Sequence, residues 1–138
     1  MVKASQVRLM VVEDDPDTAM LIQETLEDHF GPGTVTHFGS VSAALAVDVD
    51  EIDMVLSDMN LPDGTGLELL EKLLERRADL PVILVTAEQI LDLALEAIRK
   101  GAYDYVIKAG DYLFAIPVVV EKNLAIQRTK QENDQLHV

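Results

Sequence analysis

Polar side chains that could do chemistry follow four short apolar runs of this sequence. Three acids come directly after the run Val7–Val12, and another, Asp58, stands just after the run that begins at Met54. A hydroxyl and an amine follow two later runs. A strand that only fills a core has no use for a carboxylate at its tip, so these residues indicate a site. The full set is Glu13, Asp14, Asp15, Asp58, Thr86 and Lys108.

The types of these residues point to one kind of chemistry. Carboxylates packed closely repel one another, which raises their pKa values unless a cation intervenes. Oxygen ligands without His or Cys favour a hard cation, of which Mg²⁺ is the natural one, and Mg²⁺ is often completed by a phosphate oxygen. Asp58 is then either a metal ligand or a nucleophile that forms an acyl phosphate. Thr86 can donate to a phosphoryl oxygen, and Lys108 can neutralise another.

Such a site requires strands that deliver these residues to one place. Five short runs, mostly rich in β-branched residues and bounded by Asp, Gly, Pro or Asn, have the features of strands. Three of them barely alternate between apolar and polar residues, as expected for strands buried on both faces of a parallel sheet. The predicted strands are Val7–Val12, Thr34–Phe38, Met54–Leu56, Pro81–Val85 and Tyr103–Ile107.

Helical patterns alternate with these strands. Apolar residues recur at steps of three and four, Pro16 suits a first turn, Ser40 suits an N-cap, and Gly101 suits a helix C-terminus. Alternating strands and helices predict an α/β fold with a five-stranded parallel sheet covered on both faces. Ligands collect at the carboxyl edge of such a sheet. The predicted helices are Pro16–His29, Ser40–Val47, Gly66–Arg76, Glu88–Lys100 and one from about Pro117 to Arg128 or beyond.

The composition narrows the class of protein. A chain of 138 residues suits one domain. Its formal net charge of −14 repels a phosphate backbone, which argues against nucleic-acid binding. Cysteine is absent, so disulfides and thiolate metal sites are excluded. No apolar run approaches the roughly 18 residues of a membrane span, and the N-terminus lacks the apolar stretch of a signal peptide. We therefore expect a cytoplasmic domain without membrane contact.

Four segments carry a family resemblance, and they occur in order, each at a predicted strand end. They are VVEDD (Val11–Asp15), LSDMNLPDGTG (Leu56–Gly66), LPVILVTAE (Leu80–Glu88) and GAYDYVIK (Gly101–Lys108). With these segments the chain resembles the receiver domain of two-component response regulators, of the chemotaxis-regulator type. The resemblance implies a doubly wound, flavodoxin-like fold with the βα unit repeated five times. It implies a receiver domain over residues 1–128 and a helical tail or linker over residues 129–138.

The resemblance also implies roles for the acids. Asp58 would be the phosphoacceptor, which receives a phosphoryl group from a sensor histidine kinase or a phosphotransfer protein. Asp14 would bind Mg²⁺ directly, together with Asp58, and Glu13 would act through water. Asn60 would offer its backbone carbonyl to the same ion. The chain would then be a switch that phosphorylates and dephosphorylates itself rather than a conventional enzyme.

Further roles follow from the same resemblance. Thr86 and Lys108 would hold the phosphoryl group, and Tyr105 would be the aromatic that rotates when the domain switches. Asn60 and Glu88 stand at positions that tune the lifetime of the acyl phosphate, and this pair resembles that of the faster-hydrolysing members. The switched surface would bind a downstream protein or a covalently linked output domain, and a second copy of the chain is a further candidate partner.

Two features depart from the family pattern. Ala109 and Gly110 follow Lys108 where the family usually has Pro, often with a cis bond. A cis bond before a residue other than Pro costs about 2.5–4 kcal/mol, so the Lys108–Ala109 bond is expected to be trans. The segment 110–116 is also longer than usual before Pro117. Both departures affect the output face, which is the surface formed by the last strand and the last helix, more than they affect the phosphoryl chemistry.

Simpler interpretations stand beside these roles. Asp15 suits a helix start, Thr86 could cap a helix near Glu88, and Tyr105 could be an ordinary half-buried aromatic. Two other functions also remain. One is a receiver-like interaction module that works without phosphorylation. The other is a phosphatase with an aspartate nucleophile, although the first strand ends in EDDPDT, which misplaces Thr18 from the D-x-D-x-T pattern of those enzymes.

Overall fold

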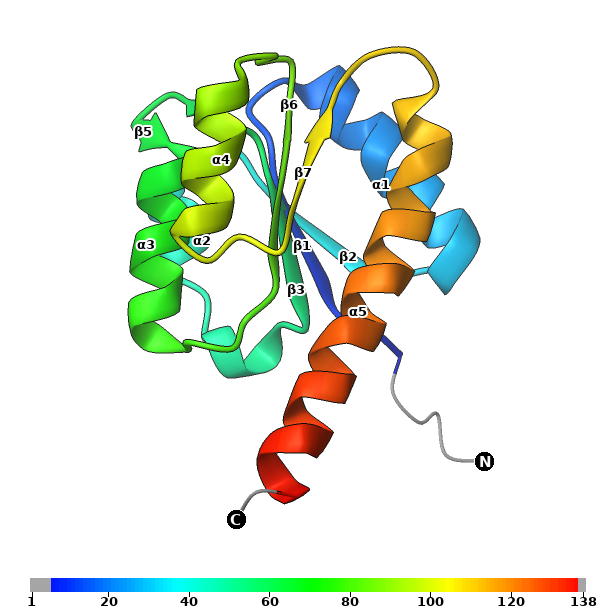
Figure 1. The fold of residues 1–138 in the computed structure, drawn as a ribbon. Coiled ribbons are helices and arrows are strands. Elements are labelled where there is room, and N and C mark those ends of the chain that lie inside the picture. Colours follow the sequence, from blue (N-terminus) through cyan, green and yellow to red (C-terminus); the bar gives the residue numbers. More distant parts are fainter. Residues whose placement is uncertain (1–5, 137–138) are drawn as a thin grey trace.

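The chain forms a parallel five-stranded sheet with helices on both of its faces (Figure 1). This computed structural model describes residues 6–136. The strand order is β2-β1-β3-β6-β7, with every neighbouring pair parallel. The predicted doubly wound α/β fold is thereby confirmed. The strands are β1 (Leu9–Val12), β2 (Val35–Phe38), β3 (Met54–Ser57), β6 (Val82–Thr86) and β7 (Asp104–Ile107).

The helices divide between the two faces of the sheet. Figure 1 shows one group to the right of the sheet and a second group to its left. The first group is α1 (Pro16–Phe30) and α5 (Tyr112–Leu136), and the second is α2 (Val41–Leu45), α3 (Gly66–Arg76) and α4 (Leu91–Arg99). A short 3-10 helix, η1 (Val49–Glu51), precedes β3. No helix within residues 6–136 is long and apolar enough to cross a membrane.

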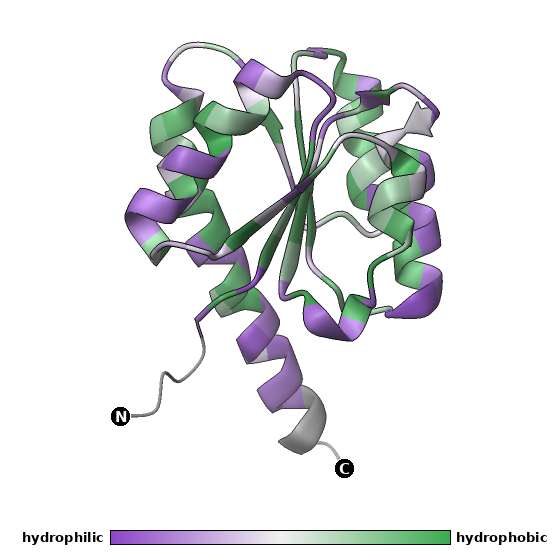
Figure 2. Cartoon of the chain, turned by 180° about the vertical axis from the view of Figure 1, so that it is seen from behind, coloured by the Kyte–Doolittle hydropathy of each residue, from purple (hydrophilic) through white to green (hydrophobic). Residues whose placement is uncertain are grey.

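The central strands are buried on both sides, which explains their uninterrupted apolar runs. All residues of β1 are buried. Met10 and Val12 belong to the core under α2, α3 and α4, whereas Leu9 and Val11 belong to the core under α1 and α5. The strands at the centre of Figure 2 are accordingly coloured mostly as hydrophobic. A parallel sheet covered by helices on both faces requires this pattern.

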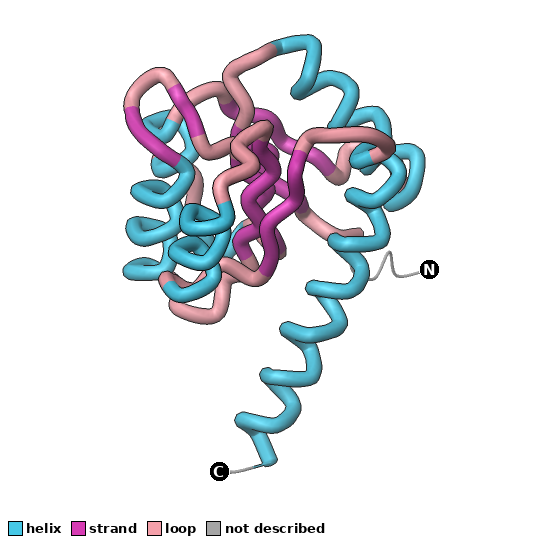
Figure 3. The backbone as a smooth tube through the Cα atoms, turned by 45° about the horizontal axis from the view of Figure 1, so that its top comes forward, coloured by secondary structure: helices cyan, strands magenta, loops and turns pink. Residues whose placement is uncertain are grey.

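The register of the sheet brings several strand ends to one edge. Val12 pairs with Ser57, and Thr86 pairs with Ile107, so β1 and β3 end together, as do β6 and β7. Figure 3 tilts this edge, which lies at the top of Figure 1, toward the viewer. The residues that directly follow these four strand ends therefore enter the same group of loops.

Helix α4 begins three residues later than predicted. It runs from Leu91 to Arg99, and Ile90 before it is extended, with φ −95° and ψ 114°. The predicted start, Glu88, instead contacts other elements: its carboxylate accepts from Asn60 Nδ2, and its carbonyl accepts from the Tyr105 hydroxyl. Tertiary contacts therefore hold the segment before Ile90 outside the helix. Gly101 follows the helix with φ +111°, as expected for a C-terminal glycine.

Helix α5 begins five residues earlier than predicted. It begins at Tyr112, so Pro117 lies inside the helix, and the segment predicted as a long loop forms its first turns. The Asp111 carbonyl accepts from the amides of Phe114 and Ala115, and the core contacts of Ile116 offset the hydrogen bond that Pro117 cannot make. The helix continues through the predicted tail to Leu136, and residues 137 and 138 lie outside the described residues. No cis peptide bond occurs within residues 6–136, so the Lys108–Ala109 bond is trans, as predicted.

A small hairpin between β3 and α3 was not predicted. It consists of β4 (Asn60–Leu61) and β5 (Gly64–Thr65), which pair in the antiparallel direction. Strands of two residues give almost no periodic signal, so the turn residues Pro62 and Asp63 indicated only a loop.

Candidate functional site

Two acids and the lysine meet at the carboxyl edge of the sheet. Lys108 Nζ donates to Asp58 Oδ2 at 3.1 Å and also to Glu13 Oε1. Glu13 is buried, with 2% of its surface exposed, and the other two are partly buried. Glu13 and Asp58, which lie 95 and 50 positions from Lys108 along the chain, therefore share its ammonium group.

Backbone hydrogen bonds extend the sheet just far enough to place this group. The amide of Asp58 donates to the carbonyl of Val12 at 2.9 Å, and the amide of Lys108 donates to the carbonyl of Thr86 at 2.8 Å. The Met59 amide then donates to Asp58 Oδ1 at 2.6 Å. Each functional residue is thus held by the neighbouring strand, and both oxygens of the Asp58 carboxylate have a donor.

The acids form a group that could hold a metal ion. Glu13, Asp14 and Asp58 each offer a carboxylate oxygen, and these atoms lie within 4.8 Å of one another. Asp14 is exposed, whereas Glu13 is buried. Three carboxylates against one ammonium leave an excess of negative charge, and oxygen donors in this number suit a hard divalent cation. The chemistry of the donor set therefore fits Mg²⁺.

The protonation of the group reflects its burial. Burial raises the pKa of Glu13, and the nearby Asp58 charge acts in the same direction, while the bond to Lys108 opposes both. Burial alone would lower the pKa of Lys108, but its hydrogen bonds to Glu13 and Asp58 raise it above the ordinary value. Lys108 is therefore a cation throughout the physiological range.

A second set of contacts centres on Glu88. Its carboxylate accepts from Asn60 Nδ2 at 3.0 Å, its amide donates to Thr86 Oγ1 at 3.3 Å, and its carbonyl accepts from the Tyr105 hydroxyl at 3.1 Å. Asn60 follows Asp58 by two residues, and Thr86 and Tyr105 lie on β6 and β7. One loop residue therefore links three residues that the sequence assigned to different tasks.

The simpler interpretations of Asp15 and Thr86 have different outcomes. Asp15 is the N-cap of α1 and accepts from the Thr18 amide at 3.2 Å, as its helix-start interpretation predicted. Thr86 does not cap α4, because that helix begins at Leu91 and Ile90 precedes it without a side-chain cap.

Gly66, at the start of α3, was not among the predicted site residues. A Cβ atom on Gly66 would lie 2.4 Å from the backbone oxygen of Asp58, so a larger residue would displace the site. The Gly66 amide also donates to the Met59 carbonyl at 2.7 Å. A glycine at the first position of an otherwise Leu-rich helix was the available signal, since glycine is a poor helix former.

Comparisons with known proteins agree with this geometry. The family model described as the response regulator receiver domain matches residues 9–112. The C4-dicarboxylate transport transcriptional regulatory protein DctD of Rhizobium meliloti (strain 1021) is 39% identical over 101 residues, which cover 72% of this chain and 22% of the relative. The regulatory protein AtoC of Escherichia coli (strain K12) is 30% identical over 130 residues, covering 94% of this chain and 28% of the relative. The chain thus spans about a quarter of the length of these curated relatives.

Solved structures show the same fold. NtrX from Brucella abortus has a TM-score of 0.82 at 28% identity, and the match covers 94% of this chain and 30% of that one. The CheY-like receiver domain protein from Methanospirillum hungatei JF-1 has a TM-score of 0.80 at 26% identity, covering 91% of this chain and 99% of that one. Sequence, fold and the acidic strand ends lead to one family. This chain belongs to the response regulator receiver domain family and is a receiver domain of two-component response regulators.

Proposed function

We propose that Asp58 is the phosphoacceptor of this receiver domain, and that its phosphoryl group comes from a sensor histidine kinase or a phosphotransfer protein in the cytoplasm. The observation that carries the proposal is the Lys108 ammonium, which lies between Asp58 and the buried Glu13. An amine held between two acids at a strand edge suits a group that arrives with negative charge.

The transfer requires little beyond positioning and charge neutralisation. A carboxylate oxygen of Asp58 attacks the phosphorus in line, while the bond from phosphorus to the donor nitrogen breaks and the donor keeps that electron pair. Lys108 neutralises one phosphoryl oxygen, and Thr86 donates its hydroxyl to another. Asp14, Asp58, the Asn60 carbonyl and, through water, Glu13 would hold Mg²⁺, which neutralises charge on the phosphoryl oxygens when bound.

The proposed switch passes through the Glu88 contacts. When the Thr86 hydroxyl moves toward a phosphoryl group, it loses the hydrogen bond that it accepts from the Glu88 amide. The change reaches Tyr105 because its hydroxyl donates to the carbonyl of the same residue, Glu88. The change would bias the face formed by α4, β7 and α5 toward a downstream protein or a linked output domain. This face includes exposed apolar side chains on α4, namely Leu91, Leu95 and Ile98.

The direct test is phosphorylation of the purified chain by acetyl phosphate with Mg²⁺, read by intact mass. We expect wild type to gain one phosphoryl group and Asp58→Ala to gain none. Asp50→Ala is the matched control, because Asp50 is an exposed acid on η1, away from the site. An adduct on Asp58→Ala would reject the assigned residue, and no adduct on wild type would favour the module that acts without phosphorylation.

A further inference from the structure

The hairpin that carries Asn60 is anchored at its tip as well as at its base. Asn60 pairs with Thr65, and Leu61 pairs with Gly64, which leaves Pro62 and Asp63 at the turn. At the base, the Gly66 amide donates to the Met59 carbonyl at 2.7 Å. The tip is held by a different element, α2.

The anchor at the tip is the Asp63 carboxylate. Its Oδ1 accepts from the Val41 amide at 2.8 Å, and its Oδ2 accepts from the Ser42 amide at 3.0 Å. Ser40 Oγ accepts from the next amide, that of Ala43, at 3.1 Å. Both Asp63 oxygens are therefore engaged with the first turn of α2, and an anion is favoured at the start of a helix.

Helix α2 is a firm attachment point because it packs into the core. Val41 and Ala44 are buried, with 5% and 0% of their surfaces exposed. Leu61 of the hairpin is buried against the same cluster. A carboxylate that joins the hairpin tip to α2 therefore ties the loop after Asp58 to the rigid part of the fold.

We propose that Asp63 is a positioning residue of the metal site: by fastening the hairpin to α2, it sets the place of the Asn60 backbone carbonyl. The inference rests on the proposed function, in which that carbonyl is a Mg²⁺ ligand. The Asp63 side chain itself does not reach the metal group, which Glu13, Asp14 and Asp58 form. Groups that orient a metal ligand affect metal binding although they do not touch the ion.

A purely structural role would give a different result. Asp63 is exposed, so water can satisfy the two α2 amides once the carboxylate is removed. The fold then keeps its core, and the loss falls on the order of the hairpin. Metal affinity should accordingly change more than the stability of the domain does.

The experiment titrates Mg²⁺ alone into the ¹⁵N-labelled chain and follows the amide signals by NMR. We expect Asp63→Ala to weaken Mg²⁺ binding about tenfold, the lower end of the loss seen when groups that orient metal ligands are removed. Asp63→Asn keeps one acceptor oxygen and should lie between wild type and Asp63→Ala. The matched control is Asp48→Ala, which also removes one charge and one cap, because Asp48 accepts from the Asp50 amide on η1. It should bind Mg²⁺ as wild type does.

A second measurement separates positioning from general damage. The rate of phosphorylation by acetyl phosphate is followed against Mg²⁺ concentration. We expect Asp63→Ala to need more Mg²⁺ but to reach the wild-type rate at saturation. Wild-type Mg²⁺ affinity in Asp63→Ala, or an equal loss in Asp48→Ala, would overturn the inference.

The two proposals fail in different ways. A wild-type chain that binds Mg²⁺ but gains no phosphoryl group contradicts only the proposed function, and the NMR titration still decides the role of Asp63. A wild-type chain that binds no Mg²⁺ overturns the metal site and the role of Asp63 with it.

Discussion

Single residues at this site are constrained by contacts from several strands at once. Lys108 neutralises the buried Glu13 and the partly buried Asp58 together, and a cation shared in this way is costly to remove, because it leaves a buried acid unpaired. Gly66 is constrained by space rather than charge, since a Cβ atom added to it would meet the backbone of Asp58. The site therefore depends on the absence of a side chain at Gly66 as well as on the charged side chains around it.

Replacing Gly66 by Ala tests that steric constraint. The new Cβ would lie 2.4 Å from the Asp58 backbone oxygen. We expect a loss of about 1–3 kcal/mol in the free energy of unfolding, as is typical of overpacking, measured by denaturant titration. The control is Gly64→Ala, whose Cβ would approach only side-chain atoms, the nearest at 3.3 Å. An equal loss in both variants would show that the contact with Asp58 is not the cause.

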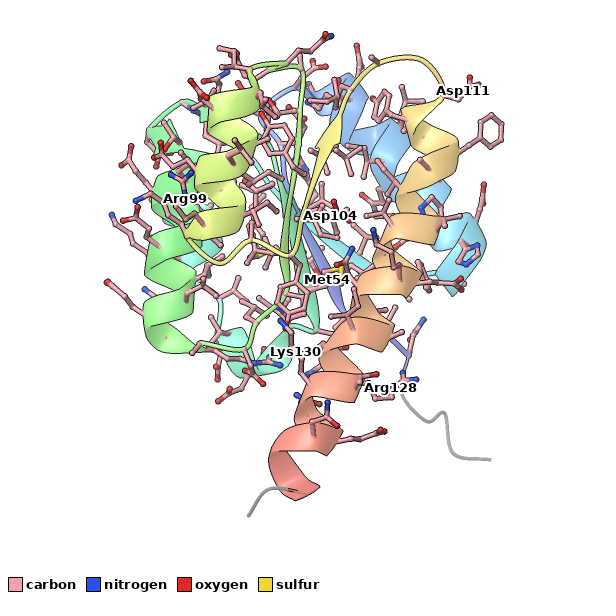
Figure 4. The ribbon with its side chains drawn as sticks, in the orientation of Figure 1. Met54, Arg99, Asp104, Asp111, Arg128 and Lys130 are labelled. Carbon is pink, nitrogen blue, oxygen red and sulfur yellow. The ribbon has the colours of Figure 1, made fainter. Side chains whose placement is uncertain are left out.

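Among the elements, α5 is tied by polar contacts to β7 and to the loop between α3 and β6. Near its middle, Lys122 and Asn123 donate to the Asp104 carboxylate on β7, and Figure 4 labels Asp104 and, lower on α5, Lys130. Farther along, Gln127 donates to the Asp79 carbonyl at 3.0 Å, and Gln131 donates to Asp79 Oδ2 at 3.1 Å. Polar contacts therefore hold part of the hydrophilic stretch of α5 in Figure 2 to the domain.

Removing the Asp79 side chain should loosen the end of α5. The hydrogen bond to Gln131 lowers the pKa of Asp79, and Arg77 adds to the effect. We expect Asp79→Ala to speed amide hydrogen exchange near the end of α5 by about fivefold, the equivalent of about 1 kcal/mol for one hydrogen bond. Exchange in α1 should not change. Asp92→Ala, an exposed acid on α4, is the control, and faster exchange in that variant would contradict the assignment.

The same contact has a defined pH dependence. Because the folded-state pKa of Asp79 is depressed, its contribution to stability is fully present above the ordinary value of 3.8 and is lost as pH falls through the lower folded value. Wild-type exchange at the end of α5 should approach that of Asp79→Ala only below about pH 4.

At the scale of the whole molecule, the negative charge is large and part of it is concentrated at one edge of the sheet. The chain carries a formal net charge of −14, so repulsion between its acids opposes the compact state. Monovalent salt screens this repulsion in general, whereas a bound divalent cation relieves it at one place. The two effects can be separated by experiment.

Mg²⁺ should stabilise the domain more than Na⁺ does at equal ionic strength. At a tenfold excess over Kd, binding to the folded state alone adds about 1.4 kcal/mol, or roughly 5 °C in Tm. Asp14→Asn should lose this increment, because Asp14 is the exposed acid of the metal group. Asp17→Asn makes the same change of charge in the first turn of α1 and should keep it. A calorimetric scan in which both variants respond like wild type would contradict a Mg²⁺ site at Asp14.

Much of the fold could be read from local sequence. The apolar runs around Val11, Leu56 and Leu84 have the pattern of strands buried on both faces. The caps at Asp15, Ser40 and Gly101 were visible because capping depends on neighbouring residues alone. Parallel strands share one carboxyl edge, so the meeting of Glu13, Asp58 and Lys108 also followed from the alternation of strands and helices.

The tertiary structure decided what local patterns do not encode. Contacts of Glu88 with Asn60 and Tyr105 delayed the start of α4, and core burial of Ile116 allowed α5 to pass through Pro117. The two hydrogen bonds that Asp63 accepts from amides of α2 likewise join residues 22 and 21 positions apart. Such contacts depend on the packing of distant segments, whose free energy outweighs the propensity of a few residues at the end of an element.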